Sequence, residues 1–331
     1  MKDRYFIGID GGATKTVGVL FDNNGKTLSS YFVEGSNLSI SEEISSRRIV
    51  NLINKLIENS KIKIDDIYSI GIAVAGASNE TGREHLFGLL DNLNLSDKTV
   101  ITNDVETVYD YIWQSKNGGM LINVGTGVIC VGKKNNVFVK IAGNGHDKGD
   151  IGSGYWIAKE TLLELSYKDS SIDSQDYQSI LEAACLHYNV KSYQDLINSI
   201  NSNPDNISYI ASFTKKIIKM AENNESELAI RLVQHATRVI ADYIVELRDT
   251  MEYGNQDVIL AGHGSVLKNS FFRKELNNAL SFEFNDIKWI FLDISAAYTA
   301  GLFSARLKDF KIDRKDIVNE TTLIEENFKD E

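Results

Sequence analysis

The chain has 331 residues, which is enough for two domains that each bury a hydrophobic core. It carries 35 Lys and Arg against 46 Asp and Glu, a formal net charge of -11. This balance argues against nucleic acid or an anionic membrane as a partner, but it does not exclude a phosphate ligand, which backbone dipoles can hold. The two cysteines form no C-x-x-C motif, and no segment has the length of a signal-peptide core or a membrane span. We therefore expect a cytoplasmic protein.

Strands and helices alternate in the first third of the chain. Three strands come first, then a helix with a capping box (Ser39-x-x-Glu42) at its start, and then two strand-helix pairs. The predicted strands are 5–9, 16–21, 27–33, 69–74 and 99–102, and the helices end near residues 60, 95 and 114. The order is therefore βββ-α-β-α-β-α.

The same order begins again near residue 117. The predicted strands of this second copy are 120–124, 128–132, 137–141, 258–260 and 288–291, and a final helix covers 295–307. A long helical insertion at about 153–253 separates its third and fourth strands. An apolar stripe in this insertion predicts a buried helix face and places His235 in the core; the stripe is Leu228, Leu232, His235, Val239, Tyr243 and Leu247.

This duplication predicts an α/β protein with two domains. The first covers 1–116 and is completed by the C-terminal helix 295–308. The second covers 117–294 and contains the insertion, and the polar tail 309–331 has no assigned role.

A glycine-rich turn follows the first strand of each copy. The first turn, in the segment 8–16 (GIDGGATKT), joins strand to strand, whereas G-x-G-x-x-G and P-loop turns open a helix. Its backbone N–H groups and hydroxyls can cradle a phosphate chain, and Asp10 is placed to hold Mg²⁺ through water. An ordinary glycine-rich hairpin remains the alternative for this stretch alone. Because Asp10, Gly76, Asp104 and Gly125 all fall at strand ends, we expect an active-site cleft between the domains.

Taken together, these segments resemble the N-acetylglucosamine kinase branch of the actin/Hsp70/sugar-kinase superfamily. That branch also contains the activator ATPases of benzoyl-CoA reductase and 2-hydroxyacyl-CoA dehydratase. Segments 8–16 and 123–127 are similar to its two phosphate motifs, 261–266 to its adenosine motif, and 101–104 to the segment with its catalytic aspartate. Segment 143–157 is similar to the pattern G-W-G-H-x-x-G-D-E-G-S-x-Y-W-I. The resemblance covers nearly the whole chain and implies two ribonuclease-H-like (actin-like ATPase) domains with the cleft between them.

The resemblance also implies a reaction, which is ATP-dependent phosphorylation of an aminosugar with Mg²⁺. The acceptor would be N-acetylglucosamine or a close relative, phosphorylated at O6, with Asp104 as the general base. Asp10 would hold the metal. The implied ATP-binding residues are Gly11, Gly12, Thr14, Lys15, Thr16, Gly125, Thr126, Gly127, Gly262 and Gly264. The implied sugar-binding residues are Asn37, Gly76, Asn144, Gly145 and Asp150.

Several of these positions have a second interpretation. Asn144 stands where the family pattern has a tryptophan that lines the sugar pocket, and Ile151 replaces a customary glutamate. The exchange at 144 predicts a preference for a bulkier or more polar aminosugar. Asp150 could instead be a helix N-cap, and Asn37 could simply end its loop. A cap role for Asp104 is compatible with catalysis.

Two other functions stay open for the same fold. An activator ATPase needs cysteine ligands for a shared iron–sulfur cluster, and neither Cys130 nor Cys185 has a cluster-like context. A regulator that binds ATP or a sugar without catalysis is the second alternative. The zinc-containing repressor group is disfavoured because its cysteine-rich loop is missing. The sequence leaves a homodimer open.

Overall fold

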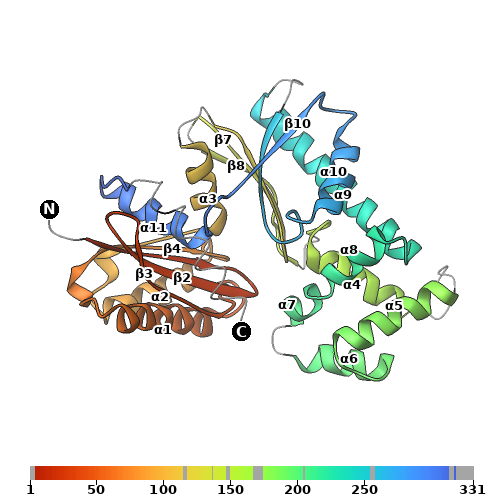
Figure 1. The fold of residues 1–331 in the computed structure, drawn as a ribbon, viewed down its shortest axis with the longest axis horizontal. Helices are drawn as coiled ribbons and strands as arrows, with labels where there is room; N and C mark the ends of the chain where they lie inside the picture. The colour runs from red at the N-terminus through yellow and green to blue at the C-terminus, as the bar shows by residue number, and fades with distance from the viewer. Residues whose placement is uncertain are drawn as a thin grey trace. The chain divides into compact units, whose positions relative to one another are not determined.

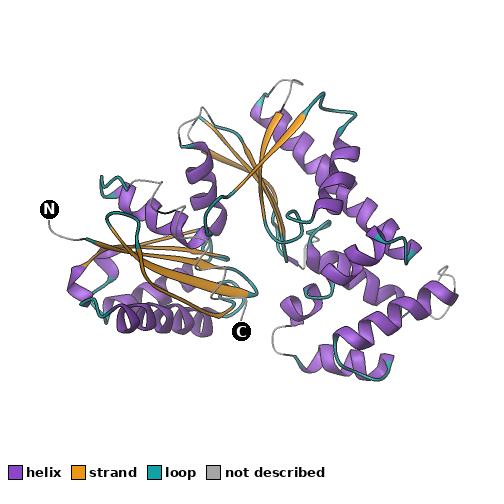
Figure 2. Cartoon of the chain, viewed as in Figure 1, coloured by secondary structure: helices purple, strands orange, loops and turns teal. Residues whose placement is uncertain are grey.

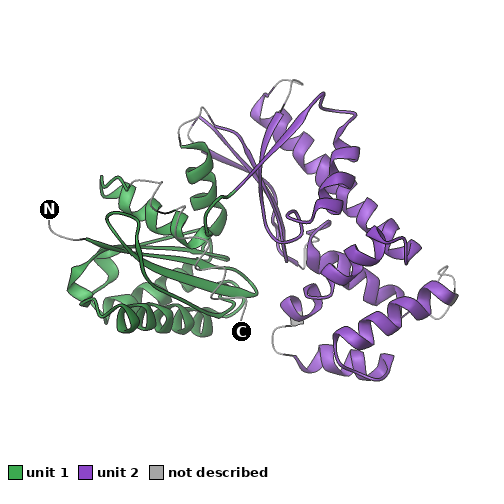
Figure 3. Ribbon diagram, in the orientation of Figure 1, with its two compact units in different colours: residues 1–116, 292–331 green, residues 117–291 purple. Residues whose placement is uncertain are grey.

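The computed structural model describes residues 4–114, 118–135, 137–146, 150–166, 174–203, 206–253, 258–312 and 317. The chain divides into two compact units, Met1–Lys116 with Leu292–Glu331, and Asn117–Phe291 (Figure 3). Each unit has its own sheet with helices packed against it (Figures 1 and 2). In the described ranges, no helix is both long enough and apolar enough to cross a membrane.

The sheet of the first unit has five strands in the order β3-β2-β1-β4-β5. Strand β1 is antiparallel to β2 and parallel to β4, and β4 is parallel to β5. The strands are β1 (Tyr5–Gly11), β2 (Lys15–Asp22), β3 (Thr27–Glu34), β4 (Ile67–Val74) and β5 (Thr99–Thr102). The helices are α1 (Glu42–Ser60), α2 (Glu80–Asp91), α3 (Asp104–Trp113) and α11 (Ala296–Leu307), with short 3-10 turns at Ile64–Asp66 and Ser96–Lys98. The predicted order of elements is confirmed, and the mixed α/β architecture with it.

Strand β1 is buried on both faces because its residues alternate between two cores. Ile7 and Ile9 belong to a cluster that includes residues of α1 and α2, whereas Phe6 belongs to a cluster with residues of α11. A strand buried on both faces is apolar, which is why residues 5–9 form a continuous apolar run that ends at Asp10.

Helix α11 packs its backbone directly onto the middle of this sheet. Gly8 and Gly71 are paired across β1 and β4. A Cβ atom on Gly8 would lie 1.9 Å from the carbonyl oxygen of Ala297, and one on Gly71 would lie 1.9 Å from that of Ala300. The hydroxyls of Ser69 and Ser304 meet at 2.9 Å beside them. The C-terminal part of the chain is therefore built into the first unit.

The second unit repeats this sheet. Its strand order is β10-β9-β6-β7-β8, in which β6 takes the place of β1, and the parallel and antiparallel pairings match. The strands are β6 (Met120–Val124), β7 (Val128–Lys134), β8 (Val137–Ala142), β9 (Val258–His263) and β10 (Ile287–Phe291). The helices are α4 (Gly154–Glu164), α5 (Ser174–His187), α6 (Tyr193–Ser202), α7 (Asn206–Ala211), α8 (Thr214–Glu222), α9 (Glu227–Met251) and α10 (Ser270–Leu280).

Two local predictions about helices are wrong. The predicted capping box does not form, because α1 begins at Glu42 after Ser41, and the Ser39 N–H bonds to Asn37 Oδ1 at 2.9 Å. The buried face of α9 is also displaced around the helix from the predicted stripe. It consists mainly of Leu228, Ala229, Val233, Ala236, Ile240, Ile244 and Leu247. His235 is consequently exposed and stacks on Trp156 with ring centroids 5.3 Å apart.

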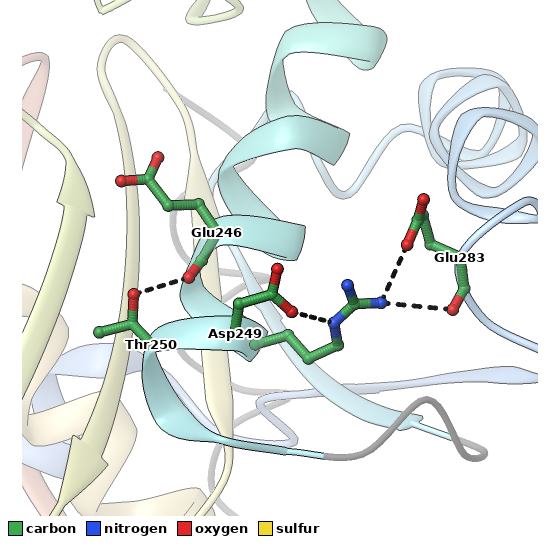
Figure 4. A network of polar contacts seen from close by, with 5 residues as sticks. Glu246, Asp249, Thr250 and Glu283 are labelled. Carbon is green, nitrogen blue, oxygen red and sulfur yellow. Dashed lines mark hydrogen bonds and ion pairs between the residues drawn. The ribbon is translucent and has the colours of Figure 1, made fainter.

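The C-terminal end of α9 is held by a buried guanidinium (Figure 4). Arg248, whose side chain is 6% exposed, pairs with Asp249 at 2.8 Å and with Glu283 at 3.1 Å. The carboxylate of Glu246, two residues before Arg248 in α9, points away from this network in Figure 4. The network fixes α9 against the segment that follows α10.

The contact of α11 with the sheet predicts opposite effects for two glycine substitutions. Gly8→Ala should lower the free energy of unfolding by about 1–3 kcal/mol, because its methyl group would overlap a backbone carbonyl. Gly88→Ala, in α2, is the control, since a Cβ there meets nothing within 4 Å. It should raise the stability by about 0.5–1 kcal/mol. Urea denaturation measures both, and equal stability of the two variants would contradict this packing.

Candidate functional site

The predicted metal-binding carboxylate, Asp10, and the predicted general base, Asp104, share one edge of the first sheet. Asp10, Ala73 and Thr102 lie side by side at one level of β1, β4 and β5. Parallel neighbours are spaced by about 4.8 Å, so Asp10 and Thr102 are about 10 Å apart along this edge. Asp104 follows Thr102 by two residues, at the start of α3. The fold therefore brings Asp10 and Asp104 to the carboxyl ends of two parallel strands, β1 and β5, with β4 between them.

The first glycine turn is tight, and both of its glycines lie close to other atoms. The Gly12 N–H donates to the Lys15 carbonyl at 3.0 Å and closes the hairpin. A Cβ on Gly11 would lie 2.8 Å from Val74 Cγ2. Neither glycine has a positive φ. Thr14 and Lys15 are exposed at the tip of the turn, where the Lys15 ammonium lies 4.1 Å from the Phe32 ring centroid.

A second loop supports this turn, and the sequence did not reveal its role. A Cβ on Gly35 would lie 2.0 Å from the Ala13 carbonyl oxygen, so only glycine fits there. The Ser36 N–H donates to the Gly12 carbonyl at 2.9 Å, and the buried Thr16 hydroxyl donates to Ser36 Oγ at 2.8 Å. Thr16, predicted to bind phosphate, therefore has a hydroxyl that braces the turn from inside the unit.

Asn37 and Gly76 meet at the same edge. Asn37 forms a parallel bridge with Ala75, and Gly76 has a φ of 76°. A Cβ on Gly76 would lie 2.4 Å from Asn37 Oδ1. That oxygen accepts the Ser39 N–H at 2.9 Å, so this atom of Asn37 makes a contact within its own loop.

Asp104 is the first residue of α3, and its carboxyl is shielded from water. Its predicted cap role is wrong, because the N-cap is Asn103, whose Oδ1 accepts the Val105 N–H at 3.1 Å. Burial raises the pKa of Asp104 to about 6, against the lowering effect of hydrogen bonds from the backbone N–H groups of Val105 and Asp104 itself. A carboxyl with a pKa near neutrality suits a general base.

The second glycine turn meets the predicted adenosine motif at one edge of the other sheet. The Gly125 N–H donates to the Gly127 carbonyl at 2.9 Å. Gly264 has a φ of 89°, and a Cβ there would lie 2.4 Å from the Val124 carbonyl oxygen. A Cβ on Gly262 would lie 2.4 Å from the Phe291 ring. These contacts require glycine at both positions of the motif.

Segment 143–157 packs onto the second turn, although residues 147–149 of it lie outside the described residues. Asp150 is 8% exposed, and its Oδ1 accepts the Asn144 N–H at 3.0 Å. Burial raises the pKa of Asp150, while the nearby His146 lowers it. The N-cap interpretation of Asp150 is wrong, because Ser153 caps α4. The Gly154 N–H donates to the Gly125 carbonyl at 2.8 Å, which joins the two segments.

A sequence model of the BadF/BadG/BcrA/BcrD ATPase family matches residues 7–300. The chain belongs to this ATPase family. An N-acetylmuramic acid/N-acetylglucosamine kinase of Clostridium acetobutylicum is 27% identical over 301 residues, which cover 90% of this chain and 97% of that protein. An N-acetyl-D-glucosamine kinase of Dictyostelium discoideum is 32% identical over 181 residues, which cover 50% and 55% of the two chains.

The fold of this family member also matches solved structures. A candidate N-acetylglucosamine kinase from Chromobacterium violaceum superposes with a TM-score of 0.69 at 18% identity. The match covers 91% of this chain and 99% of that one. It establishes the shared fold, which is an α/β architecture with two mixed sheets.

His263 lies beside the second glycine turn, and the sequence alone did not indicate a role for it. It ends β9 opposite Asn123. Burial lowers its pKa to about 4, so the imidazole is neutral at physiological pH. None of the described residues offers a hydrogen bond to its buried Nδ1. Its position inside segment 261–266, the predicted adenosine motif, is the sequence feature that could have indicated it.

Two cavities differ in whether predicted site residues line them. A cavity of about 350 Å³ is lined by Asn144 and Asp150 among others. A larger one of about 880 Å³ lies beside α3 and α11, where Tyr111 and Arg306 line it, and contains none of the predicted residues.

The described carboxylates could hold Mg²⁺ only together with the phosphates of a bound nucleotide. Among the residues that the structure describes, no group of three or more His, Cys, Asp or Glu side chains is arranged to hold a metal. Mg²⁺ is commonly bound through one or two carboxylates together with substrate phosphates and water. Asp10, a single carboxylate beside a glycine turn, is compatible with this mode of binding.

The raised pKa of Asp104 predicts a pH-dependent stability. The folded state holds this proton up to about pH 6, whereas the unfolded chain releases it near 3.8, so stability is lost as the pH rises between these values. Relative to the wild type, Asp104→Asn should therefore gain stability from pH 4 to pH 7, by about 3 kcal/mol at most. Urea denaturation at both pH values measures this, and a pH-independent difference would contradict it.

Proposed function

We propose that the protein transfers the γ-phosphoryl group of ATP to a hydroxyl of an aminosugar. The acceptor is N-acetylglucosamine or a close relative, and the hydroxyl is O6. The observation that carries this proposal is the carboxyl of Asp104, with a pKa raised to about 6, on the same sheet edge as Asp10. Membership of an ATPase family and the 27% identity to an aminosugar kinase support it.

Asp104 is the general base of the proposed reaction. At pH 7 its carboxyl is ionised, and it accepts the proton of the acceptor hydroxyl as that oxygen attacks. Bound ATP supplies the phosphoryl group, and Mg²⁺ neutralises its charge. Asp10 holds this metal through water.

The glycine turns are proposed to hold the nucleotide. Phosphate contacts come from Gly11, Gly12, Thr14, Lys15, Gly125, Thr126 and Gly127, while Gly262 and Gly264 allow adenine to approach the backbone. Thr16 keeps the first turn in shape through Ser36. Turns without side-chain bulk leave backbone dipoles accessible to an anion.

The acceptor is proposed to contact Asn37, Gly76, Asn144, Gly145 and Asp150. Gly145 supports this assignment, because its φ is 91° and a Cβ there would meet nothing within 4 Å. Asp150 holds the Asn144 backbone in place from a buried position. The loop is held on one side by Asp150 and has free space beside Gly145, which suits contact with a polar ligand.

The activator-ATPase alternative is weaker than the kinase. Cys130 is fully buried in β7, and burial raises the pKa of its thiol, which disfavours the thiolate that a cluster requires. Cys185, in α5, is the chain's remaining cysteine. A non-catalytic regulator differs from the kinase in having no turnover.

The kinase proposal predicts that ATP is consumed only when Mg²⁺ and an aminosugar are both present. A coupled assay with N-acetylglucosamine, glucosamine, N-acetylmannosamine, N-acetylmuramic acid and glucose measures this. ATP hydrolysis that no sugar changes would favour an ATPase. Binding without any turnover would favour a regulator.

The base proposal predicts that Asp104→Asn loses about 10²–10⁴-fold in kcat. In the wild type, kcat/KM should rise with pH through about 6, because the base must be ionised, and the variant should lose this limb. Asp97→Asn, at an exposed carboxylate, is the control and should keep normal turnover. Near-normal turnover of Asp104→Asn would assign the proton to another group.

A further inference from the structure

Two positions of segment 143–157 at which the chain departs from the family pattern line the same cavity. Asn144 and Ile151 both border the cavity of about 350 Å³ in the second unit. An amide at 144 occupies less space than the indole of the pattern, and an isoleucine at 151 removes a negative charge. The exchange at 144 therefore makes this cavity larger, and the exchange at 151 makes it less negative. The cavity lies beside the proposed acceptor contacts.

Hydrogen-bond donors line this cavity from three elements. Lys140 comes from β8, Asn144 from the following loop, and Tyr243 from α9. The Lys140 ammonium gives one N–H to the Gly143 carbonyl at 2.7 Å and has two more. Burial raises the pKa of Tyr243, so its hydroxyl keeps its proton at neutral pH.

The two acidic residues that line the cavity differ in burial. Asp150 is buried and directs Oδ1 to the Asn144 N–H, and Lys140 and His146 oppose its charge. Glu246 is exposed on α9, and its carboxylate points away from the Arg248 network in Figure 4. Asp242, also on α9, is exposed as well but is not one of the lining residues. No ion pair joins Lys140 to Glu246 within the described residues.

We propose that this cavity is a specificity pocket for a carboxylate-bearing substituent on the aminosugar ring, and that Lys140 recognises the carboxylate. The inference rests on the proposed function, because it assigns a subsite to that acceptor. Lys140 forms a charge-assisted hydrogen bond with the substituent, and the amide of Asn144 and the hydroxyl of Tyr243 add neutral donors. Glu246 opposes the same charge from the exposed rim and limits the affinity.

Two acceptors that differ in this substituent test the pocket. N-acetylmuramic acid carries a carboxylate on its ring substituent, whereas N-acetylglucosamine has a hydroxyl at that position. The measured quantity is the ratio of kcat/KM for the first acceptor to kcat/KM for the second. Lys140→Gln should lower this ratio by about 10–100-fold, as expected for loss of a hydrogen bond to a charged group. Lys140→Arg should restore most of it.

Two further variants separate charge recognition from a general disturbance. Glu246→Gln should raise the ratio several-fold, because it removes the opposing charge. Lys133→Gln is the matched control, since Lys133 lies on β7 against Phe138 and does not line the cavity. It should leave the ratio unchanged. An unchanged ratio in Lys140→Gln, or an equal drop in the control, would overturn the proposal.

Calorimetric binding distinguishes failure of this inference from failure of the kinase proposal. If no sugar is phosphorylated, the kinase proposal fails. Binding of N-acetylmuramic acid that Lys140→Gln weakens and Lys133→Gln retains would still support the pocket. If the wild type prefers glucosamine, whose amine is cationic, Glu246 rather than Lys140 sets the specificity and the pocket assignment is wrong.

Discussion

The first unit depends on the contact between helix α11 and the glycine pair Gly8–Gly71. No side chain separates the helix backbone from β1 and β4 at this point, so their distance is fixed by backbone atoms alone. The same helix reaches α3, because Thr299 donates to the Thr107 hydroxyl at 3.0 Å and Arg306 pairs with Asp110. One helix from the C-terminal part of the chain thus fixes both the strand that carries Asp10 and the helix that starts at Asp104.

Glycine serves the two proposed nucleotide turns in two different ways. Gly11 in the first turn and Gly35 in the loop that supports it are needed because other atoms come too close for a Cβ, although neither has a positive φ. In the second unit, Gly264 has both a positive φ and a close carbonyl. Close packing makes each turn rigid, and a rigid turn can present backbone groups to a phosphate without first being ordered.

The two carboxyls proposed for the acceptor side differ in what surrounds them. Asp104 is desolvated at a helix start, which raises its pKa to about 6 and leaves it able to exchange a proton near neutrality. Asp150 is also buried, but it accepts a backbone N–H at 3.0 Å and lies near His146 and Lys140. Both carboxyls accept backbone N–H groups, but only Asp150 has basic side chains that oppose the effect of burial. Desolvation without a neighbouring positive charge suits proton transfer, whereas neighbouring positive charges suit a positioning role.

The sequence by itself determined the duplicated order of strands and helices, since that order follows from apolar periodicity and glycine turns, which are local. It also placed Asp10 and Asp104 at strand ends, and its motifs indicated the family. Only the tertiary structure decided which residues cap helices, as Asn103 and Ser153 do in place of Asp104 and Asp150. It likewise decided that His235 is exposed and that Asn144 and Ile151 share a cavity with Lys140. The physical reason differs between these features. The cap contacts are local, but the residue at which each helix begins is set by the backbone conformation, which residue type alone does not give. Helix faces and cavities depend on which segments, distant in sequence, pack together, and no local pattern contains that information.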